Sequence, residues 1–381
     1  MRVILGMHME KRGVRIIIAG GGTGGHLFPA VAIAEEFLER SQMSDVLFIG
    51  TERGLEARLL PGLGFALRTI RVEGVKGRGS IGMIGPLLKI PRGITQSVSI
   101  LREFRPDIAL GVGGYASGPA VIAAHFMGIK TAIAEQNALP GFTNRMLGRF
   151  VDRVFLTFPD REGRFAAAKT IVTGNPVRRG FAKEIKKSRR GENTFSILIF
   201  GGSQGARAIN RAVVGSMKYL EDMRGRLVIT HQTGKEDFDE VSAAYRDRGV
   251  TAEVHPFITD MSSAYGAADL LICRAGATSI AEITVTGKAS VLIPYPFAVG
   301  GHQELNARVL ADAGAAEMIL EDRLDGKTLA GIIRKLAGSP ETIRRMEEES
   351  ERMGNVEAAA RIVDECMIML DREPLTEVGG A

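Results

Sequence analysis

The feature that most constrains the fold is a repeated alternation of short apolar runs with stretches of helical periodicity. The first run, Val14–Ala19, is rich in β-branched residues, and glycines and a helical stretch expected to span 29–40 follow it, with Pro29 as an allowed first helical residue. The same order returns at Phe195–Phe200, which leads into GGSQGA and a second helical stretch. Further apolar runs are VLFIG at 46, DIALGVGG at 107, LVITHQTG at 227, DLLICRAGA at 269 and SVLIPYP at 290. Strands that alternate with helices predict parallel sheets with right-handed crossovers.

A chain of 381 residues exceeds the usual size of one domain, and the renewed strand-loop-helix order predicts two. The polar, basic stretch 174–193 is the expected boundary region. We therefore expect an α/β protein of two Rossmann-like domains whose parallel sheets face each other across a cleft. The first domain is expected at 1–178 and the second at 179–355, and the helical segment 356–381 is expected to pack back on the first.

Composition and charge limit the classes of protein to which the chain can belong. Hydrophobic residues make up 45% and charged residues 24% of the chain, which is typical of a folded globular protein. Cys273 and Cys366 lie far apart in apolar stretches, so neither a disulfide framework nor a CxxC site is expected. No signal peptide and no run long enough to span a bilayer is expected. The net charge of +5 favours anionic partners, but it does not distinguish a nucleotide from a phospholipid head group or a nucleic acid.

The glycine-rich string GGGTGGH, from Gly20 to His26, has three interpretations. It fits the GxGxxG pattern of dinucleotide-binding proteins, but the second apolar run ends in Gly50, and the acidic residue expected there comes only at Glu52. It also resembles a P-loop, in which His26 would replace the lysine that grips the terminal phosphates. The third interpretation is a tight turn with no ligand.

Similar glycine strings recur at GVGGYASGP, GGSQGA and RAGA, each between an apolar run and a helical stretch. Glycine lets backbone N–H groups approach a ligand, and a helix N-terminus behind them favours a phosphate. One such loop is explained by a tight turn alone. Four together predict an enzyme that handles phosphates and sugar hydroxyls.

A set of strings resembles, in order, the bacterial MurG transferases. These strings are GGGTGGHLFPA, GGYASGP, EQNALPGFTNR, GNPVR, GGSQGA, HQTG, PFITDM, ADLLICRAGATSIAEI and HQELNA, and the likeness runs from about Val14 to Ala316. The resemblance implies a GT-B fold and an inverting transferase without a metal or other cofactor. It also implies the transfer of N-acetylglucosamine (GlcNAc) from UDP-GlcNAc to the MurNAc 4-hydroxyl of lipid I, undecaprenyl-pyrophosphoryl-MurNAc-pentapeptide, which gives lipid II. The implied location is peripheral, at the anionic cytoplasmic face of the inner membrane.

By the same resemblance, the second domain would hold most of the donor. Ile258 would offer backbone hydrogen bonds to uracil, and Glu282 would accept from both ribose hydroxyls, because a carboxylate has two acceptor oxygens. The alternative for Glu282 is a solvated helix charge. Ser203 would add a hydroxyl and Arg178 a cation, unless Arg178 is only a linker charge. The N-terminus of a helix would neutralise the diphosphate through Ala277, Thr278, Ser279, Ile280, Ala281 and Glu282.

The sugar contacts implied by the resemblance come from both domains. Gln303 and Asn306 open a helix, and Gln303 matches the sugar-hydroxyl contact of the family. Asn137 would reach the same sugar from the first domain. Gly300 and Gly301 depart from the family pattern, in which acidic or polar residues are frequent before the histidine and glutamine.

Two residues are candidates for the general base. His26 is the first, because an ordinary histidine pKa of about 6.5 suits proton uptake at neutral pH. Its alternatives are to cap the following helix or to orient the acceptor pyrophosphate, and Thr23, Gly24 and Gly25 of the same loop are further substrate-binding candidates. Glu135 is the rival base.

Metal chemistry is not expected from the sequence. The only DxD string, Asp237-Phe238-Asp239, lies in a charged stretch that predicts a helix face, and no HExxH string occurs.

The stretch 71–93 is the expected membrane-docking patch. It contains apolar residues flanked by lysines and arginines, which suits an anionic lipid surface. The apolar residues are Ile81, Met83, Ile84, Leu87 and Leu88. A buried loop or helix is the alternative, because Pro86 and several glycines interrupt an amphipathic helix.

Three other functions remain open from sequence. An NAD-dependent oxidoreductase would rest on GxGxxG alone. A non-catalytic protein that binds a UDP-sugar or a nucleic acid is the second, although the chain has no tryptophan and no zinc-finger or RRM signature, so no nucleic-acid partner is expected. A related UDP-sugar transferase with another acceptor is the third.

Overall fold

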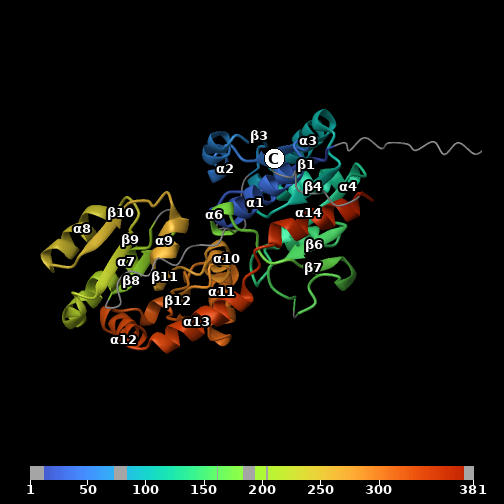
Figure 1. The fold of residues 1–381 in the computed structure, drawn as a ribbon. Coiled ribbons are helices and arrows are strands. Elements are labelled where there is room, and N and C mark those ends of the chain that lie inside the picture. The colour runs from blue at the N-terminus through green and yellow to red at the C-terminus, as the bar shows by residue number, and fades with distance from the viewer. Residues whose placement is uncertain (1–12, 73–83, 161, 183–193, 203–204, 373–381) are drawn as a thin grey trace, which may run out of the picture. The chain divides into compact units, whose positions relative to one another are not determined.

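The computed structural model describes residues 13–72, 84–160, 162–182, 194–202 and 205–372, and they form two compact units (Figure 1). The second unit is Val177–Val356 together with Asn137–Leu139, and the first contains the remaining described residues. Near the expected boundary, the chain thus passes from the first unit to the second after Pro176, two residues before the expected last residue of the first domain. Arg178 belongs to the second unit because its guanidinium pairs with a carboxylate there.

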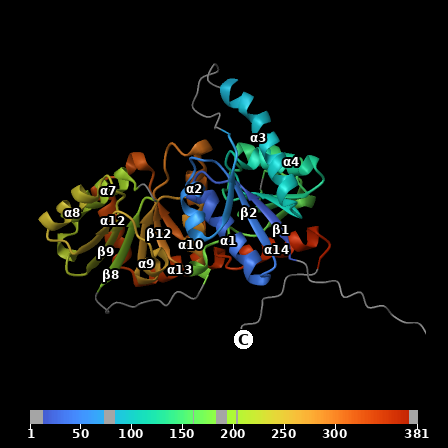
Figure 2. The ribbon, with the colours of Figure 1, turned by 90° about the horizontal axis from the view of Figure 1, so that it is seen from above.

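The first unit is a parallel seven-stranded sheet with helices on its faces (Figures 1 and 2). The strands lie in the order β3-β2-β1-β4-β5-β6-β7. Their bounds are β1 Arg15–Ala19, β2 Asp45–Gly50, β3 Ala66–Thr69, β4 Ile108–Gly111, β5 Lys130–Glu135, β6 Arg153–Leu156 and β7 Thr170–Val172. The helices are α1 Gly24–Arg40, α2 Leu55–Leu59, α3 Ile84–Phe104, α4 Ser117–Phe126, α5 Phe142–Leu147 and α14 Ala358–Met369.

The second unit is a parallel six-stranded sheet in the order β10-β9-β8-β11-β12-β13. Its strands are β8 Phe195–Phe200, β9 Leu227–Gln232, β10 Ala252–His255, β11 Leu270–Cys273, β12 Ala289–Leu292 and β13 Ala316–Met318. Its helices are α6 Arg179–Ala182, α7 Arg207–Ser216, α8 Phe238–Asp247, α9 Met261–Ala267, α10 Ala277–Val285, α11 His302–Asp312, α12 Gly326–Ala337 and α13 Pro340–Met353. Each apolar run singled out in the sequence contains a strand, as predicted.

Burial on both faces explains why the central strands read as continuous apolar runs. In β1, Ile16, Ile17 and Ile18 are fully buried, and β8 is buried along its whole length. Parallel strands also place their carboxyl ends at one edge of a sheet, where α/β proteins bind ligands. The glycine loops lie at these edges, after β1, β4, β8 and β11.

Helix α14 packs against α1 in the first unit (Figure 2). Its buried Ile362 and Cys366 belong to the same core cluster as Leu27 and Val31 of α1. Arg40 at the end of α1 also pairs with Asp364. Residues 357–372 are therefore an integral layer of the first unit.

Helix α1 begins earlier than expected. It starts at Gly24, so Pro29 lies in its second turn and not at its first position. A proline there cannot donate the usual helical hydrogen bond to the residue four positions earlier. The glycines at 24 and 25 are thus the first turn of the helix and not part of the loop before it.

None of the helices in the described part of the chain is long and apolar enough to cross a membrane.

Candidate functional site

Two glycine loops of the first unit pack closely against each other. The loop Gly20–Gly22 follows β1 and the loop Gly113–Gly114 follows β4, which pairs with β1. Gly21 donates its N–H to the carbonyl of Gly113 at 3.3 Å. A Cβ on Gly20 would lie 2.3 Å from that carbonyl oxygen, and Gly113 has a φ of +93°. Only glycine fits this approach of two backbones.

His26 lies at the start of α1, beside both loops. Its ring is half-buried, and Nδ1 lies 3.0 Å from Oε1 of Gln136, which follows β5. The His26 ring forms a hydrogen bond with this side chain and not with a backbone N–H of the helix, so His26 does not cap α1. Gln136 was not predicted as a site residue, although it stands between Glu135 and Asn137 in the EQN string.

Glu135, the rival base, is a buried anchor at the end of β5. Its Oε2 accepts from the N–H of Gly141 and from Nδ2 of Asn144, both at 2.9 Å. These two hydrogen bonds tie the loop after β5 to the first turn of α5. A carboxylate that accepts these two hydrogen bonds is suited to fixing the conformation of this loop.

Glu56 was not predicted from the sequence, and it lies directly behind the first glycine loop. Its Oε2 accepts from the N–H of Gly22 at 2.6 Å, and its Oε1 accepts from the N–H and the hydroxyl of Thr51, both at 2.9 Å. Cβ atoms on Gly21, Gly50 and Gly54 would lie 2.1–2.5 Å from the nearest atom of its side chain. Three glycines, one after β1, one at the end of β2 and one after β2, thus form a cradle for one buried carboxylate.

Glu282 lies in α10 of the second unit and is 4% exposed, so the interpretation as a solvated helix charge is wrong. Its Oε1 accepts from Nη2 of Arg178 at 2.8 Å, and Tyr265 lies 3.5 Å from its Oε2. Burial raises the pKa of Glu282, and the charge of Arg178 opposes the increase. Arg178 is therefore the partner of Glu282 and not only a linker charge.

The N-terminus of α10 has the geometry expected of an anion site. The helix begins at Ala277, directly after the N-cap Gly276, which has extended φ and ψ and no side chain to cap the first turn. The first-turn residues Thr278 and Ser279 are half-buried, and Ala277, Ile280 and Ala281 are buried.

Gln232 connects two loops of the second unit. Its Nε2 donates to the carbonyl of Gly202 at 2.9 Å, and its Oε1 accepts from the N–H of Ile258 at 2.8 Å. The N–H of Ile258, predicted to face uracil, is thus engaged by a side chain of its own unit. Ser203, in the loop next to Gly202, lies outside the described residues.

Gln303 and Asn306 project from α11. Oε1 of Gln303 accepts from the N–H of Tyr295 at 2.9 Å, and buried Asn306 accepts from the N–H of Ala138 at 3.0 Å. Nδ2 of Asn306 also lies 3.4 Å from Oδ1 of Asn137, which brings two of the predicted polar residues together.

Gly300 and Gly301, which depart from the family pattern, have a backbone reason to be glycine. Their φ angles are +63° and +69°, in the left-handed region that other residues rarely adopt.

Asp237 of the DxD string is part of a buried polar network, and the string has the helical placement that was predicted. Asp237 is the N-cap of α8, and it accepts from Nε of Arg207 at 3.1 Å and from Nδ2 of Asn210 at 2.8 Å. Asn210 in turn contacts Nε2 of His231 at 3.0 Å. Burial lowers the pKa of His231 to about 3.

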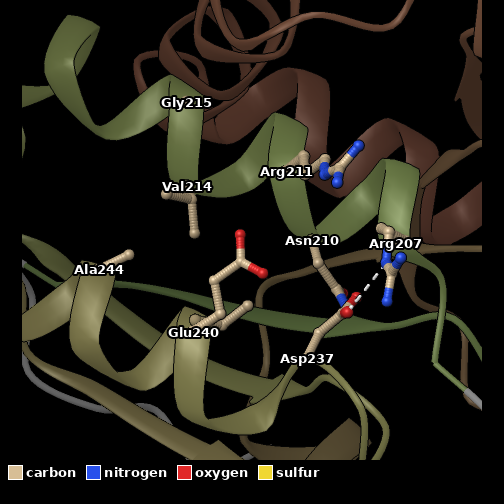
Figure 3. A pocket seen from close by; sticks show the side chains of 9 residues that line it. Arg207, Asn210, Arg211, Val214, Gly215, Asp237, Glu240 and Ala244 are labelled. Atoms are coloured by element: carbon tan, nitrogen blue, oxygen red, sulfur yellow. Dashed lines mark hydrogen bonds and ion pairs between the residues drawn. The ribbon is translucent and has the colours of Figure 1, made fainter.

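A small cavity of about 170 Å³ adjoins this network between α7 and α8. Figure 3 shows Arg207, Asn210 and Arg211 reaching into it from one helix and Glu240 from the other. Ligand pockets usually measure roughly 300–1,000 Å³, so the cavity is too small for a sugar nucleotide. Among the described residues, no group of three histidine, cysteine or acidic side chains could hold a metal ion.

Comparisons with known proteins agree with this geometry. The model of the glycosyltransferase family 28 N-terminal domain matches residues 16–156, and that of its C-terminal domain matches residues 196–364. The chain is 56% identical, over 94% of its length and 99% of the relative, to the UDP-N-acetylglucosamine--N-acetylmuramyl-(pentapeptide) pyrophosphoryl-undecaprenol N-acetylglucosamine transferase of Syntrophus aciditrophicus. The chain belongs to the MurG family. The Myxococcus xanthus enzyme of the same name is 48% identical over 94% of this chain and 93% of that protein.

A solved MurG structure has the same fold as this family member. MurG of Acinetobacter baumannii is 32% identical and superimposes with a TM-score of 0.77, over 93% of this chain and 99% of that one. The two parallel-sheet units are accordingly the two Rossmann-like domains of a GT-B glycosyltransferase, as the sequence predicted.

Proposed function

We propose that this chain transfers GlcNAc from UDP-GlcNAc to the MurNAc 4-hydroxyl of lipid I, with inversion, to give lipid II and UDP. The observation that carries the proposal is the 56% identity to a transferase of that name over nearly the full length of both proteins. Because the match spans both domains, it includes the residues expected at the donor and at the acceptor.

On the donor side, Glu282 accepts hydrogen bonds from the ribose hydroxyls, and the first turn of α10 receives the diphosphate. Burial raises the pKa of Glu282, and the charge of Arg178 opposes this and favours the ionised form that can accept two hydrogen bonds. The leaving UDP gains negative charge, and the positive end of the α10 dipole stabilises that charge. Gln303 and Asn137 contact the sugar, and the backbone carbonyl of Ile258, whose N–H is engaged by Gln232, contacts the base.

On the acceptor side, His26 takes the proton of the attacking hydroxyl. Its ring is half-buried beside the Gly20–Gly22 and Gly113–Gly114 loops, and one ring nitrogen is held by Gln136. Thr23, Gly24 and Gly25 of the same turn contact the acceptor pyrophosphate. Glu135, with its carboxylate engaged by Gly141 and Asn144, supports the loop in place of serving as the base.

The transfer is tested with UDP-GlcNAc labelled in the sugar and a short-chain lipid I analogue, in the presence of a chelator. We expect labelled lipid product with the chelator present. No product from protein that still binds UDP would disprove the assigned acceptor and would favour a related transferase. Binding of NADH in place of UDP would instead revive the oxidoreductase alternative.

We further propose that the protein acts as a peripheral protein at the anionic cytoplasmic surface of the inner membrane. Residues 73–83 of the expected patch lie outside the described residues, and α3 begins at Ile84. Support comes from α4 and α5, where Phe126 is 78% exposed and Phe142 is 67% exposed. Met146 and Phe150 follow Phe142 at four-residue spacing and are also exposed, next to exposed Arg145 and Arg149. Aromatic side chains beside arginines suit an anionic lipid interface.

Co-sedimentation with anionic vesicles tests this location. We expect Leu87→Ser with Leu88→Ser, and separately Phe126→Ser with Phe142→Ser, to reduce the bound fraction. The control replaces Met43 and Leu63, exposed apolar residues outside both sets, with serine. Binding unchanged in both test variants would contradict the proposed surfaces.

A further inference from the structure

The amide of Gln136 has one orientation fixed by its surroundings. Gln136 is 1% exposed, and its Nε2 donates to the carbonyl of Ala134 at 3.3 Å. A carbonyl oxygen only accepts, so the amide nitrogen must face Ala134. The amide oxygen then faces Nδ1 of His26, 3.0 Å away.

This orientation decides which nitrogen of His26 carries the proton. An amide oxygen can only accept, so Nδ1 of the neutral ring must be the donor and Nε2 must hold the lone pair. We propose that Gln136 is a positioning residue that fixes His26 as the Nδ1–H tautomer and thereby makes Nε2 the proton acceptor. The inference deepens the proposed function and rests on His26 serving as its base.

The glycine loop after β4 adds a steric restraint on the same edge of the ring. A Cβ on Gly113 would lie 2.8 Å from Cε1 and 2.9 Å from Nδ1 of His26. Gly113 therefore leaves just enough room for the ring in this position. The backbone of Gly113 lies against the Nδ1 edge of the imidazole, and the Gln136 amide forms a hydrogen bond at the same edge. Together they hold the ring in this position.

The anchor of the amide is itself held by a second side chain. The carbonyl of Ala134 also accepts from Nδ2 of Asn144 at 3.1 Å, and Asn144 donates to Glu135. Strand β5 and the first turn of α5 therefore form a rigid support behind Gln136. This placement matches the arrangement in which a base is oriented by a third group.

The acceptor hydroxyl gives its proton to Nε2, and its oxygen forms a bond to the anomeric carbon. The bond from that carbon to the UDP oxygen breaks, and its electron pair leaves with UDP. His26 becomes an imidazolium with a proton on each nitrogen, and Oε1 of Gln136 still accepts from Nδ1–H throughout.

Long-range ¹H–¹⁵N spectra of the histidine-labelled full chain measure the tautomer directly. His26→Gln identifies the His26 signals by their loss. We expect the Nδ1–H tautomer in the wild type and a mixture of tautomers in Gln136→Met. An Nε2–H tautomer in the wild type would overturn the inference, whatever the activity.

Kinetics separate positioning from a merely structural role. We expect Gln136→Met to lower kcat about 10- to 100-fold with little change in the acceptor KM or in UDP binding, as for other residues that orient a functional histidine. Gln136→Glu keeps an acceptor at Nδ1, so it should retain more of kcat than Gln136→Met. Its carboxylate also favours the imidazolium, so the acidic limb of its pH–kcat profile should move to higher pH.

A structural role predicts the opposite order, because a buried charge costs more stability than a buried methionine. Gln96→Met is the matched control, since the Gln96 amide oxygen likewise accepts one hydrogen bond, here from the backbone N–H of Arg71 at 2.8 Å, away from the loops. Wild-type kcat in Gln136→Met, or lower kcat in Gln136→Glu than in Gln136→Met, would overturn the inference. A wild-type chain that makes no lipid product would defeat the proposed function instead, and the spectra would still test the tautomer.

Discussion

Nη2 of Arg178 lies 2.8 Å from Oε1 of Glu282, so the segment that begins the second unit supplies the counter-charge for a buried carboxylate of α10. Burial raises the pKa of this carboxyl, and the arginine opposes the increase. The pair therefore sets the pH at which Glu282 can accept two hydrogen bonds from a ribose.

Removal of Arg178 should make UDP binding more sensitive to acid. A carboxyl with a raised pKa takes up its proton at a higher pH than an ordinary glutamate, and the protonated form loses acceptor capacity. UDP affinity should therefore decrease as the pH falls toward the acidic range, and in Arg178→Met the decrease should begin at a higher pH. Calorimetric titration with UDP at several pH values measures this, with exposed Arg179→Met as the control. Parallel pH curves for wild type and Arg178→Met would contradict the assignment.

His231 should make the second unit acid-sensitive. Burial lowers its pKa from 6.5 to about 3, so between these values the unfolded chain binds a proton that the folded chain does not. The free energy of unfolding should decrease as the pH falls through this window, by up to about 1.4 kcal/mol per pH unit from this group. Urea unfolding at pH 7 and pH 5 should show a flatter dependence in His231→Gln than in the wild type. Equal slopes would show that His231 does not contribute.

Glu56 should affect turnover beyond its effect on stability. In Glu56→Gln, an amide NH₂ would face either the N–H of Gly22 or the donors of Thr51, so the turn before α1 should shift. The free energy of unfolding should decrease by about 1–3 kcal/mol, and a displacement near His26 should lower kcat/KM for the acceptor by about 100-fold.

Asp152→Asn is the matched control for Glu56→Gln. Asp152 likewise accepts from the N–H and hydroxyl of a threonine, Thr131, but at the opposite edge of the sheet, where β5 begins. We expect a similar loss of stability without the loss of turnover. Equal losses of turnover in the two variants would reduce Glu56 to a stabilising residue.

Gly113→Ala should be more damaging than its positive φ alone predicts. A left-handed backbone costs a non-glycine residue roughly 1–2 kcal/mol, and the alanine methyl would also meet the His26 ring at 2.8 Å. Gly128→Ala isolates the backbone cost, because Gly128 has a φ of +74° and open space around its Cβ position. We expect Gly128→Ala to lose stability only and Gly113→Ala to lose both stability and turnover, measured by urea unfolding and by the transfer assay. Full activity in Gly113→Ala would show that the ring tolerates displacement.

The sequence predicted the elements and the loops better than the contacts among side chains. Apolar runs and glycine strings are local patterns, so seven strands (β1, β2, β4, β8, β9, β11 and β12) and the positions of the four glycine loops could be predicted from them. The other six strands carry no apolar run that was singled out. The contact of His26 with Gln136 spans 110 residues, and it exists because β5 lies next to β4 and β4 next to β1. The residue types alone could not show that order. Glu56 could not be predicted as a site residue, because its only local signal is an acidic side chain close to two glycines, Gly50 and Gly54.

Helix α14 has a consequence for how the protein is made. Ile362, Cys366 and Met367 complete a core whose other side chains come from α1 and the first strands. The amino-terminal domain therefore leaves the ribosome with one apolar surface uncovered, while the next domain, nearly continuous from Val177 to Val356, emerges with its own core complete. The usual order in which domains fold during synthesis is thus reversed for this chain, because the domain translated first is the last whose core is completed. The apolar face of α1 stays uncovered until α14, which ends at Met369, has been added.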